Sequence, residues 1–310
     1  MEHIICVAGP TASGKTRLAV ALAKAYNGEV LSCDSMQLYR GMAIGTAAPT
    51  IDEMQGVPHH MIGVADPKQA FSVGKYVEMA EPVLQDILSR GRTCVVCGGT
   101  GLYADSLLLG RSFAPCPSTG VREQLEREAA QNGIEPLLSR LSQVDPEAAA
   151  RLHPSDQRRI IRALEVYLET GETISEHDRK TRLLPPKHEA VWIGLSFASR
   201  QDLYDRIDLR VEKMLEAGLL DEIRALLSSG VPPTATAMQA IGYKEFIDAL
   251  ENGGDLSAAT ALVKQRSRNY AKRQLTWLRR NEQIHWLLQP REPDFAAVFQ
   301  QARQLIPFFS

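Results

Sequence analysis

The first hundred residues alternate between short apolar runs and longer stretches in which apolar residues recur at helical spacing. The apolar, β-branched runs predict strands over Ile4–Ala8, Val30–Cys33 and Thr93–Cys97. The stretches between them predict helices over Thr16–Tyr26 and Gly74–Ser89. Strands and helices that alternate in this way favour an α/β fold, in which a parallel sheet is flanked by helices.

After about Gly110 the pattern changes to helices alone. Residues Ala114–Ser118 have the composition of a linker, and no strand pattern recurs until Ala190. The helices expected in between are Val121–Gln131, Ile134–Leu141 and Asp156–Thr170. We therefore expect residues 111–189 to form a helical insertion domain, and residues 1–110 and 190–310 to form the core.

The chain returns to the sheet near Val191–Leu195, an apolar run that predicts a further strand. The remainder of the chain is mostly periodic at helical spacing. The helices expected there are Arg200–Ala217, Leu219–Ser229, Thr236–Leu250 and Leu256–Arg280.

The composition narrows the possibilities only slightly. Of the 310 residues 44% are hydrophobic, and 35 Lys and Arg against 37 Asp and Glu indicate no particular partner. No apolar run approaches the length of a membrane span and no charged leader is visible, so we expect a cytoplasmic protein without a membrane partner. We also expect a monomer, although no residue pattern indicates the oligomeric state. Cys94 and Cys97 have metal-ligand spacing, but their apolar context favours a buried strand, and His59-His60 favours a loop.

A glycine-rich loop follows the first predicted strand. Its sequence, Gly9-Pro10-Thr11-Ala12-Ser13-Gly14-Lys15-Thr16, has the G-x-x-x-x-G-K-[S/T] spacing of a phosphate-binding loop. The glycines let backbone N–H groups converge on phosphate oxygens, and the helix N-terminus adds positive potential. Lys15 supplies a charge to the outer phosphate, and the Thr16 hydroxyl can hold Mg²⁺. We therefore expect a P-loop NTPase-like sheet that binds a di- or triphosphate, as ATP-binding proteins do.

Two further polar groups follow the next strands. Asp34 ends the second strand, and Thr100 lies in Gly98-Gly99-Thr100-Gly101 after the third. The carboxyl ends of parallel strands share one edge, so we expect both beside the phosphate loop. Asp34 can hold Mg²⁺ through water, accept a proton from a nucleophile or cap a turn, and the spacing does not separate these roles. Thr100 can donate to a substrate, unless the segment is only a glycine-rich turn.

Basic residues gather in the last predicted helix. Residues 256–281 contain no acid, and Lys264, Arg268 and Lys272 recur at intervals of four, which places them on one helix face. Tyr270 and Trp277 are interleaved and can stack on unpaired bases while the cations contact phosphates. Solvated faces normally mix Glu with Lys, so RNA or polyphosphate contact is the favoured interpretation.

Other arginines are ambiguous. Arg206 and Arg210 lie one helical turn apart and can reach a phosphate, although pairing with acids of their own helix is the routine explanation. In the predicted insertion, Arg158 and Arg159 belong to a second basic cluster that ion pairs with Asp156 and Glu165 can partly explain.

Taken together, these motifs resemble those of the tRNA dimethylallyltransferase (tRNA isopentenyltransferase) family over nearly all of the chain. The matching segments are the phosphate loop, Asp-Ser-Met-Gln at 34–37, Gly-Gly-Thr-Gly-Leu-Tyr at 98–103, Gln-Arg-Arg at 157–159, Gln-Ala-Ile-Gly-Tyr-Lys at 239–244 and Tyr-Ala-Lys-Arg-Gln-Leu-Thr-Trp at 270–277. The phosphate loop alone is common, but the set in this order is specific.

The resemblance implies transfer of a dimethylallyl group from dimethylallyl diphosphate to the exocyclic amine of the tRNA adenosine 3′ of the anticodon, giving N6-dimethylallyladenosine and diphosphate. The phosphate loop would hold the leaving diphosphate, with Mg²⁺ as cofactor. The family's general base corresponds to Asp34, its substrate-contacting threonine to Thr100 and its diphosphate-binding arginine to Arg210. The implied contacts with the tRNA anticodon stem-loop are Asp34, Ser35, Met36, Gln37, Thr100, Arg122, Gln157, Arg158, Arg159, Ile160, Ile161, Gln239, Ala240, Ile241, Gly242, Tyr243 and Lys244, to which the basic helix adds Lys272 and Arg273.

Two rival functions use the same features. A small-molecule or nucleoside kinase would bind ATP in the phosphate loop and use the arginines as a lid. A non-catalytic RNA-binding NTPase would use nucleotide as a switch. A simple kinase does not need a long acid-free helix, and Asp34 with Thr100 at one crevice argues against a switch, so the transferase is preferred.

Overall fold

The structure is a computed structural model that describes residues 3–110, 119–251 and 253–306. The linker expected over Ala114–Ser118 lies outside these ranges. The chain divides into two compact units. We call residues 1–108 with 187–310 the core unit, and residues 109–186 the insertion unit.

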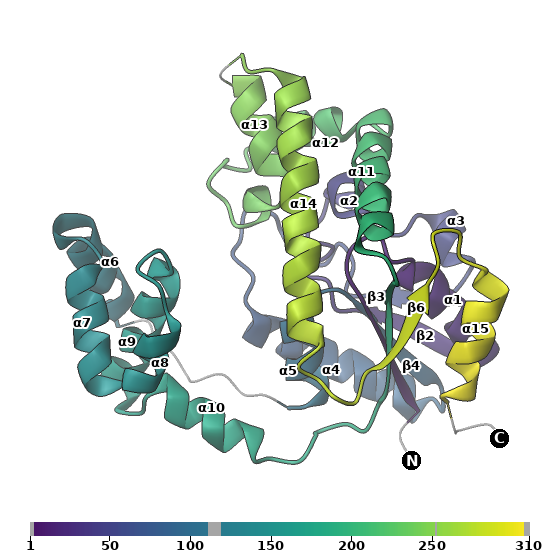
Figure 1. The fold of residues 1–310 in the computed structure, drawn as a ribbon, viewed down its shortest axis with the longest axis horizontal. Helices are drawn as coiled ribbons and strands as arrows, with labels where there is room; N and C mark the ends of the chain where they lie inside the picture. The colour runs from purple at the N-terminus through teal and green to yellow at the C-terminus, as the bar shows by residue number, and fades with distance from the viewer. Residues whose placement is uncertain (1–2, 111–118, 252, 307–310) are drawn as a thin grey trace. The chain divides into compact units, whose positions relative to one another are not determined.

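Six strands of the described core unit form one parallel sheet (Figure 1). In chain order they are β1 (Ile4–Ala8), β2 (Gly28–Ser32), β3 (His59–His60), β4 (Thr93–Gly98), β5 (Val191–Phe197) and β6 (His285–Gln289). Their order across the sheet is β3-β2-β4-β1-β5-β6, and every neighbouring pair is parallel. The predicted α/β fold is confirmed, and β1 lies inside the sheet, between β4 and β5.

Helices lie between the strands of the core unit along the chain, and α15 follows the last strand (Figure 1). The longer ones are α1 (Lys15–Ala25), α4 (Val73–Ser89), α5 (Gly101–Leu108), α11 (Arg200–Glu216), α12 (Leu219–Ser228), α13 (Tyr243–Glu251), α14 (Leu256–Leu278) and α15 (Phe295–Gln304). The short ones are α2 (Ala43–Thr46), α3 (Ile51–Met54) and the 3-10 turn η1 (Ala237–Gln239). Among the described residues, no helix combines the length and the apolarity that crossing a bilayer requires.

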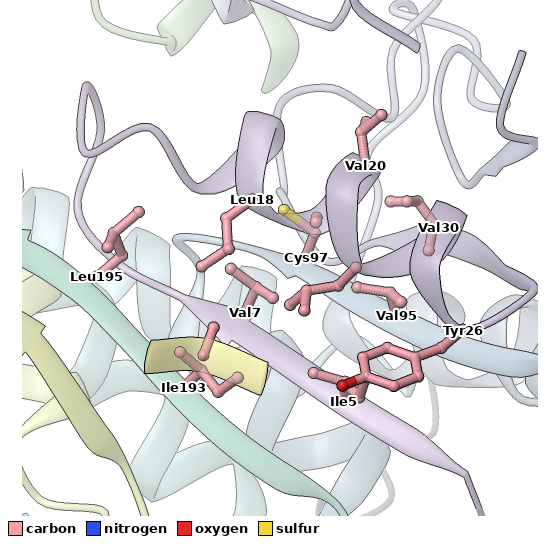
Figure 2. Close-up of a cluster of buried hydrophobic side chains, with 14 of the residues drawn as sticks. Ile5, Val7, Leu18, Val20, Tyr26, Val30, Val95, Cys97, Ile193 and Leu195 are labelled. Atoms are coloured by element: carbon pink, nitrogen blue, oxygen red, sulfur yellow. The ribbon is translucent and has the colours of Figure 1, made fainter. Parts of the chain in front are cut away.

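One hydrophobic core cluster lies between the sheet and helices α1 and α15. Figure 2 shows side chains of β1, β4 and β5, among them Val7, Val95 and Ile193, packed with Leu18 of α1. All five residues of β1 are buried, because the sheet is covered on both faces and a parallel strand then has no solvent side. This packing fixes β1 and α1, and therefore the position of the phosphate loop between them.

The insertion unit has its own core. Its helices are α6 (Val121–Asn132), α7 (Glu135–Val144), α8 (Pro146–Arg151), α9 (Gln157–Thr170) and α10 (Ile174–Arg182). The apolar residues of α6, α7 and α9 recur at helical spacing and meet in one cluster that includes Leu125, Leu141, Ile160 and Leu164. The unit therefore buries its apolar faces within itself.

The structure corrects several expectations. β6 and α15 were not predicted, and His59-His60, expected as a loop, forms the edge strand β3. The helix expected over residues 236–250 is interrupted, because the 3-10 segment ends at Gln239 and Ala240 is extended. Gly242 has a φ of 97°, and α13 begins at the next residue, Tyr243. Cys94 and Cys97 lie buried in β4, as expected.

Candidate active site

The phosphate loop occupies a tightly packed position at the carboxyl end of β1. A Cβ atom at Gly9 would lie 2.4 Å from Leu195 O, so only glycine fits there. Gly14 has a φ of 87°, which a residue with a side chain adopts only at a cost. Lys15 and Thr16 follow directly in the first turn of α1, where the helix N-terminus favours an anion.

Two buried glutamines form hydrogen bonds between this loop and other elements of the core unit. Gln274 Oε1 of α14 accepts from Thr11 N at 2.9 Å, and Gln289 Nε2 of β6 donates to Ser13 O at 2.9 Å. The sequence interpretation assigned neither residue a role. A polar residue in the otherwise apolar stripe Ala271-Gln274-Leu278 was the available indication for Gln274.

The loops after β2 and β4 lie against each other, as expected for parallel strands whose carboxyl ends share one edge. Thr100 Oγ1 accepts from Ser35 N at 3.1 Å and lies 3.3 Å from Ser35 Oγ. Asp34 Oδ1 accepts from Met36 N at 2.9 Å and from Gln37 N at 3.4 Å, so Asp34 caps the turn that follows it. Among the described residues, no hydrogen bond to the second carboxylate oxygen of Asp34 is found, which leaves that oxygen for a ligand.

Three charged side chains interact across this edge of the sheet. Burial lowers the pKa of Lys15; Cys97 and Asp34 act in the opposite direction, and Arg210 lowers it further. Burial also lowers the pKa of Arg210, against the effect of Asp34. Lys15 and Arg210 repel each other, and a bound anion would offset this repulsion, so the two cations favour binding of a phosphate group.

Arg206 and Arg210 of α11 both form hydrogen bonds with residues outside their helix. Arg210 Nη2 donates to Thr46 O at 3.2 Å, and Arg206 Nε donates to Ala12 O in the phosphate loop at 3.3 Å. Neither of these hydrogen bonds is to an acid of the same helix, which was the routine explanation. Arg206 therefore lies beside the phosphate loop, and Arg210 is close enough to Lys15 to lower the pKa of that residue.

Some of the basic side chains on α14 are already engaged in ion pairs within the protein, which its sequence does not indicate. Lys264 pairs with Glu212, and Arg268 pairs with Asp208 at 2.6 Å, so α11 supplies acids that α14 lacks. Lys272 and Arg273 are exposed, and the Arg273 guanidinium lies 5.6 Å from the Tyr270 ring centroid. The candidate RNA surface of α14 therefore narrows to its C-terminal part.

Trp277 is a structural residue in this arrangement. Its Nε1 donates to Asp105 Oδ2 at 2.9 Å, and a Cβ atom at Gly101 would lie 2.2 Å from its ring. Tyr270 is half-buried. Burial, and to a smaller extent the negative charge of Asp34, raises the pKa of Tyr270 to about 12, while the Thr100 hydroxyl acts to lower it. These contacts give Trp277 a structural role, and stacking of the two rings on RNA bases stays a prediction.

The segment expected to contact tRNA over residues 239–244 is partly buried. Gln239, Ile241 and Lys244 are accessible, whereas Ala240 and Gly242 are buried and Tyr243 is fully enclosed. The Gln239 amide donates to Pro233 O at 2.8 Å. Only part of this segment offers side chains to a partner.

In the insertion unit, the expected tRNA contacts lie at the N-terminus of α9. Gln157, Arg158 and Arg159 are exposed, whereas Ile160 and Ile161 belong to the hydrophobic core. Arg159 lies 3.6 Å from Asp156, as the ion-pair explanation expected.

Arg122 forms a two-pronged ion pair with Glu165. Its Nε lies 3.1 Å from Oε1 and its Nη2 lies 2.8 Å from Oε2. Arg122 therefore keeps a fixed orientation in the insertion unit while its side chain remains 47% exposed.

Comparison with known proteins identifies the family. The sequence model described as IPP transferase matches residues 37–281, and the one described as isopentenyl transferase matches residues 2–64. A tRNA dimethylallyltransferase of Pelobacter propionicus is 43% identical over 309 residues, covering 100% of this chain and 98% of that protein. A tRNA dimethylallyltransferase of a Thermoanaerobacter species is 45% identical over 286 residues, covering 92% of this chain and 91% of that protein.

Solved structures agree with the sequence comparison. The tRNA isopentenylpyrophosphate transferase of Bacillus halodurans superposes with a TM-score of 0.74 at 40% identity, covering 99% of this chain and 96% of that one. A eukaryotic dimethylallyltransferase acting on tRNA gives 0.81 at 28% identity, covering 98% of this chain and 77% of that one. The matches extend over the core unit and the insertion unit alike, and the chain therefore belongs to the IPP transferase family of tRNA prenyltransferases.

Proposed function

We propose that this chain transfers the dimethylallyl group of dimethylallyl diphosphate to the exocyclic amine of the adenosine 3′ of the anticodon in tRNA. The observation that carries the proposal is the meeting of three loops at one sheet edge. There, Lys15 and Arg210 offer charge to a diphosphate, and Asp34 and Thr100 lie beside them. The kinase and switch alternatives are not favoured by any of these contacts.

The phosphate loop with Lys15 and Arg210 would hold the diphosphate. Diphosphate leaves readily only when its developing negative charge is neutralised, and fixed cations and N–H groups provide this without reorganising. Arg206, bonded to Ala12 O, adds a third cation next to the loop. The C–O bond to the allylic carbon can then break as the adenine nitrogen attacks.

Asp34 would accept the proton that the attacking amine loses. The adenine amine is a weak nucleophile, so its proton needs an acceptor only as the new C–N bond forms. The turn formed by Met36 N and Gln37 N fixes one carboxylate oxygen, which orients the other. The Thr100 hydroxyl, held by Ser35 N, would hydrogen bond with the substrate beside it.

The Thr16 hydroxyl fits Mg²⁺ as a ligand. It is a half-buried oxygen in the first turn of α1, and Mg²⁺ prefers oxygen ligands and commonly combines one or two from protein with phosphate oxygens and water. Bound there, Mg²⁺ would neutralise charge on the leaving diphosphate.

A base stacked in an anticodon loop must leave the stack to reach a crevice at a sheet edge. Exposed cations would hold the RNA backbone meanwhile. The candidates are Arg122, Arg158, Arg159, Lys244, Lys272 and Arg273.

Donor binding separates this proposal from the kinase alternative. We would titrate the purified protein with dimethylallyl diphosphate and with ATP, each with Mg²⁺, and follow release of ADP. The proposal expects saturable binding of dimethylallyl diphosphate, competition by diphosphate and no ADP. ADP formation without affinity for dimethylallyl diphosphate would assign the phosphate loop to a nucleotide instead.

A further inference from the structure

Gln274 lies with its carboxamide between two loops of the candidate site. The residue is 5% exposed and comes from α14, far along the chain from either loop. Its Oε1 accepts from Thr11 N in the phosphate loop at 2.9 Å, and its Nε2 donates to Gly99 O at 3.0 Å. Each end of the amide meets its complementary group, and the opposite orientation would face donor with donor and acceptor with acceptor.

The backbone of Gly99 lies so close to the Gln274 amide that a side chain at residue 99 would collide with it. A Cβ atom at Gly99 would lie 2.2 Å from Gln274 Nε2 and 3.1 Å from Gly9 O. The phosphate loop and the loop carrying Thr100 therefore contact each other directly, with the Gln274 amide bonded to both. A shift of either loop would break one of the two hydrogen bonds and leave a buried polar group without a partner, which is costly.

Neighbouring residues on the same face of α14 fix the second loop around Thr100. Tyr270, one turn before Gln274, lies close enough to Thr100 for that hydroxyl to affect the pKa of the Tyr270 phenol. Trp277, one turn after it, donates to Asp105 and packs on Gly101. One helix face thus contacts the loop from Gly99 to Gly101 on both sides of Thr100, and it is hydrogen bonded to the phosphate loop through Gln274.

We propose that Gln274 is a positioning residue of the transfer reaction, an inference that rests on the proposed function. Its amide sets the distance between the phosphate loop, which holds the leaving diphosphate, and Thr100, which contacts the substrate. Displacements of about 1 Å between such groups are enough to slow a reaction strongly. Gln274 touches neither reacting atom, and it acts through Thr11 N and Gly99 O.

Two variants separate the two ends of the amide. Gln274→Glu keeps an oxygen for Thr11 N but loses the N–H that donates to Gly99 O. We expect kcat to fall about tenfold or more, with the KM for dimethylallyl diphosphate within about twofold of wild type. Gln274→Met loses both hydrogen bonds, so its KM for dimethylallyl diphosphate should also rise, by about tenfold.

The pH dependence of kcat is a second measurement, and a general loss of stability would not produce the expected change in it. A protonated Glu carries an O–H group that can donate to Gly99 O, and burial raises the pKa of a carboxyl group. The ratio of kcat for Gln274→Glu to wild-type kcat should therefore rise as the pH is lowered. Gln274→Met should show no such recovery.

Gln265→Met serves as the matched control, because Gln265 is exposed on the same helix. It should keep wild-type kcat and KM. If wild-type protein transfers the prenyl group and both Gln274 variants behave like this control, Gln274 has no positioning role. Parallel falls in kcat for the two variants, with KM and the pH ratio unchanged, would also overturn the proposal. If the wild-type protein itself transfers nothing, the proposed function fails instead.

Discussion

The hydroxyl of Tyr243 donates a hydrogen bond of 2.6 Å to Glu222 Oε1. The same carboxylate accepts from Ile44 N at 2.8 Å and from Gly45 N at 3.0 Å, at the start of α2. Helix α2 ends at Thr46, whose carbonyl accepts from Arg210. Tyr243, which was expected to contact tRNA, is therefore a buried residue that stabilises α2 through Glu222. Helix α2 in turn orients Arg210, a candidate diphosphate-binding residue.

Tyr243→Phe tests this role. Phe keeps the ring that packs on Gly45 but loses the donor to Glu222, so we expect a loss of about 1–2 kcal/mol in the free energy of unfolding, measured in urea. The affinity for tRNA should not change, because Tyr243 is 0% exposed. The exposed Lys244→Gln is the matched comparison and should weaken tRNA binding at unchanged stability. Weaker tRNA binding by a fully stable Tyr243→Phe would show that the ring contacts RNA after all.

Asp34→Asn tests the proton acceptor. The Asn oxygen can still accept from Met36 N and Gln37 N, so the turn should stay folded. The amide cannot accept a proton at neutral pH, and kcat should fall by roughly two to four orders of magnitude. Affinity for tRNA, measured by filter binding, should be within about twofold of wild type. An unchanged kcat would remove Asp34 from the mechanism.

Lys15→Met tests the phosphate loop. The change removes the charge but keeps an unbranched side chain in the half-buried position. We expect the Kd for dimethylallyl diphosphate, measured by calorimetry, to rise roughly tenfold to a hundredfold, the cost of one hydrogen bond to a charged group. Binding of tRNA alone should be unaltered. Wild-type affinity for the donor would show that Lys15 does not contact the diphosphate.

Replacing Lys272 and Arg273 by Gln tests the RNA surface. Each lost phosphate contact should lower the slope of log affinity for tRNA against log salt concentration by about 0.7 to 0.9. The control replaces Lys264 and Arg268, which already pair with Glu212 and Asp208, and its slope should change less. Equal slopes for both double variants would show that the C-terminal part of α14 is a solvated face that does not contact RNA.

Glu29→Gln tests a buried ion cluster at the amino-terminal side of the sheet. Hydrogen bonding by Arg90, with smaller contributions from His60, lowers the pKa of Glu29 to about 2. A depressed folded-state pKa gives stability that is present above the unfolded value near 4.5 and is lost as the pH falls toward 2. We expect Glu29→Gln to cost about 2 kcal/mol of unfolding free energy at neutral pH.

That difference between wild type and Glu29→Gln should shrink as the pH is lowered through the same range, because protonated Glu29 and Gln are both uncharged. Urea unfolding at a series of acidic pH values measures it. A difference that does not vary with pH would show that the cluster does not stabilise the fold through charge.

Much of the fold follows from local pattern. The strands β1, β2, β4 and β5 were predicted because their apolar runs are continuous, as burial on both sheet faces requires. β6 was missed because only three of its five residues are apolar and it lies at the edge of the sheet, where one side faces solvent. The break at Gly242 depends on a backbone angle that helical periodicity does not report.

The candidate site was predictable where its residues follow strand ends. Asp34, Thr100 and the phosphate loop meet because parallel strands end at one edge. Tertiary partners were not predictable: the acids that pair with Lys264 and Arg268 come from α11, and Trp277 is held by Asp105 of α5. These contacts join residues distant in sequence, which no local pattern encodes.

The most direct test of the proposed function is a transfer assay with purified protein, radiolabelled dimethylallyl diphosphate, Mg²⁺ and unmodified tRNA, without ATP. The arrangement of Asp34, Thr100 and the phosphate loop predicts that label enters tRNA and is recovered after digestion as N6-dimethylallyladenosine. Failure of label to enter tRNA, together with ATP hydrolysis or phosphorylation of a small acceptor, would contradict it.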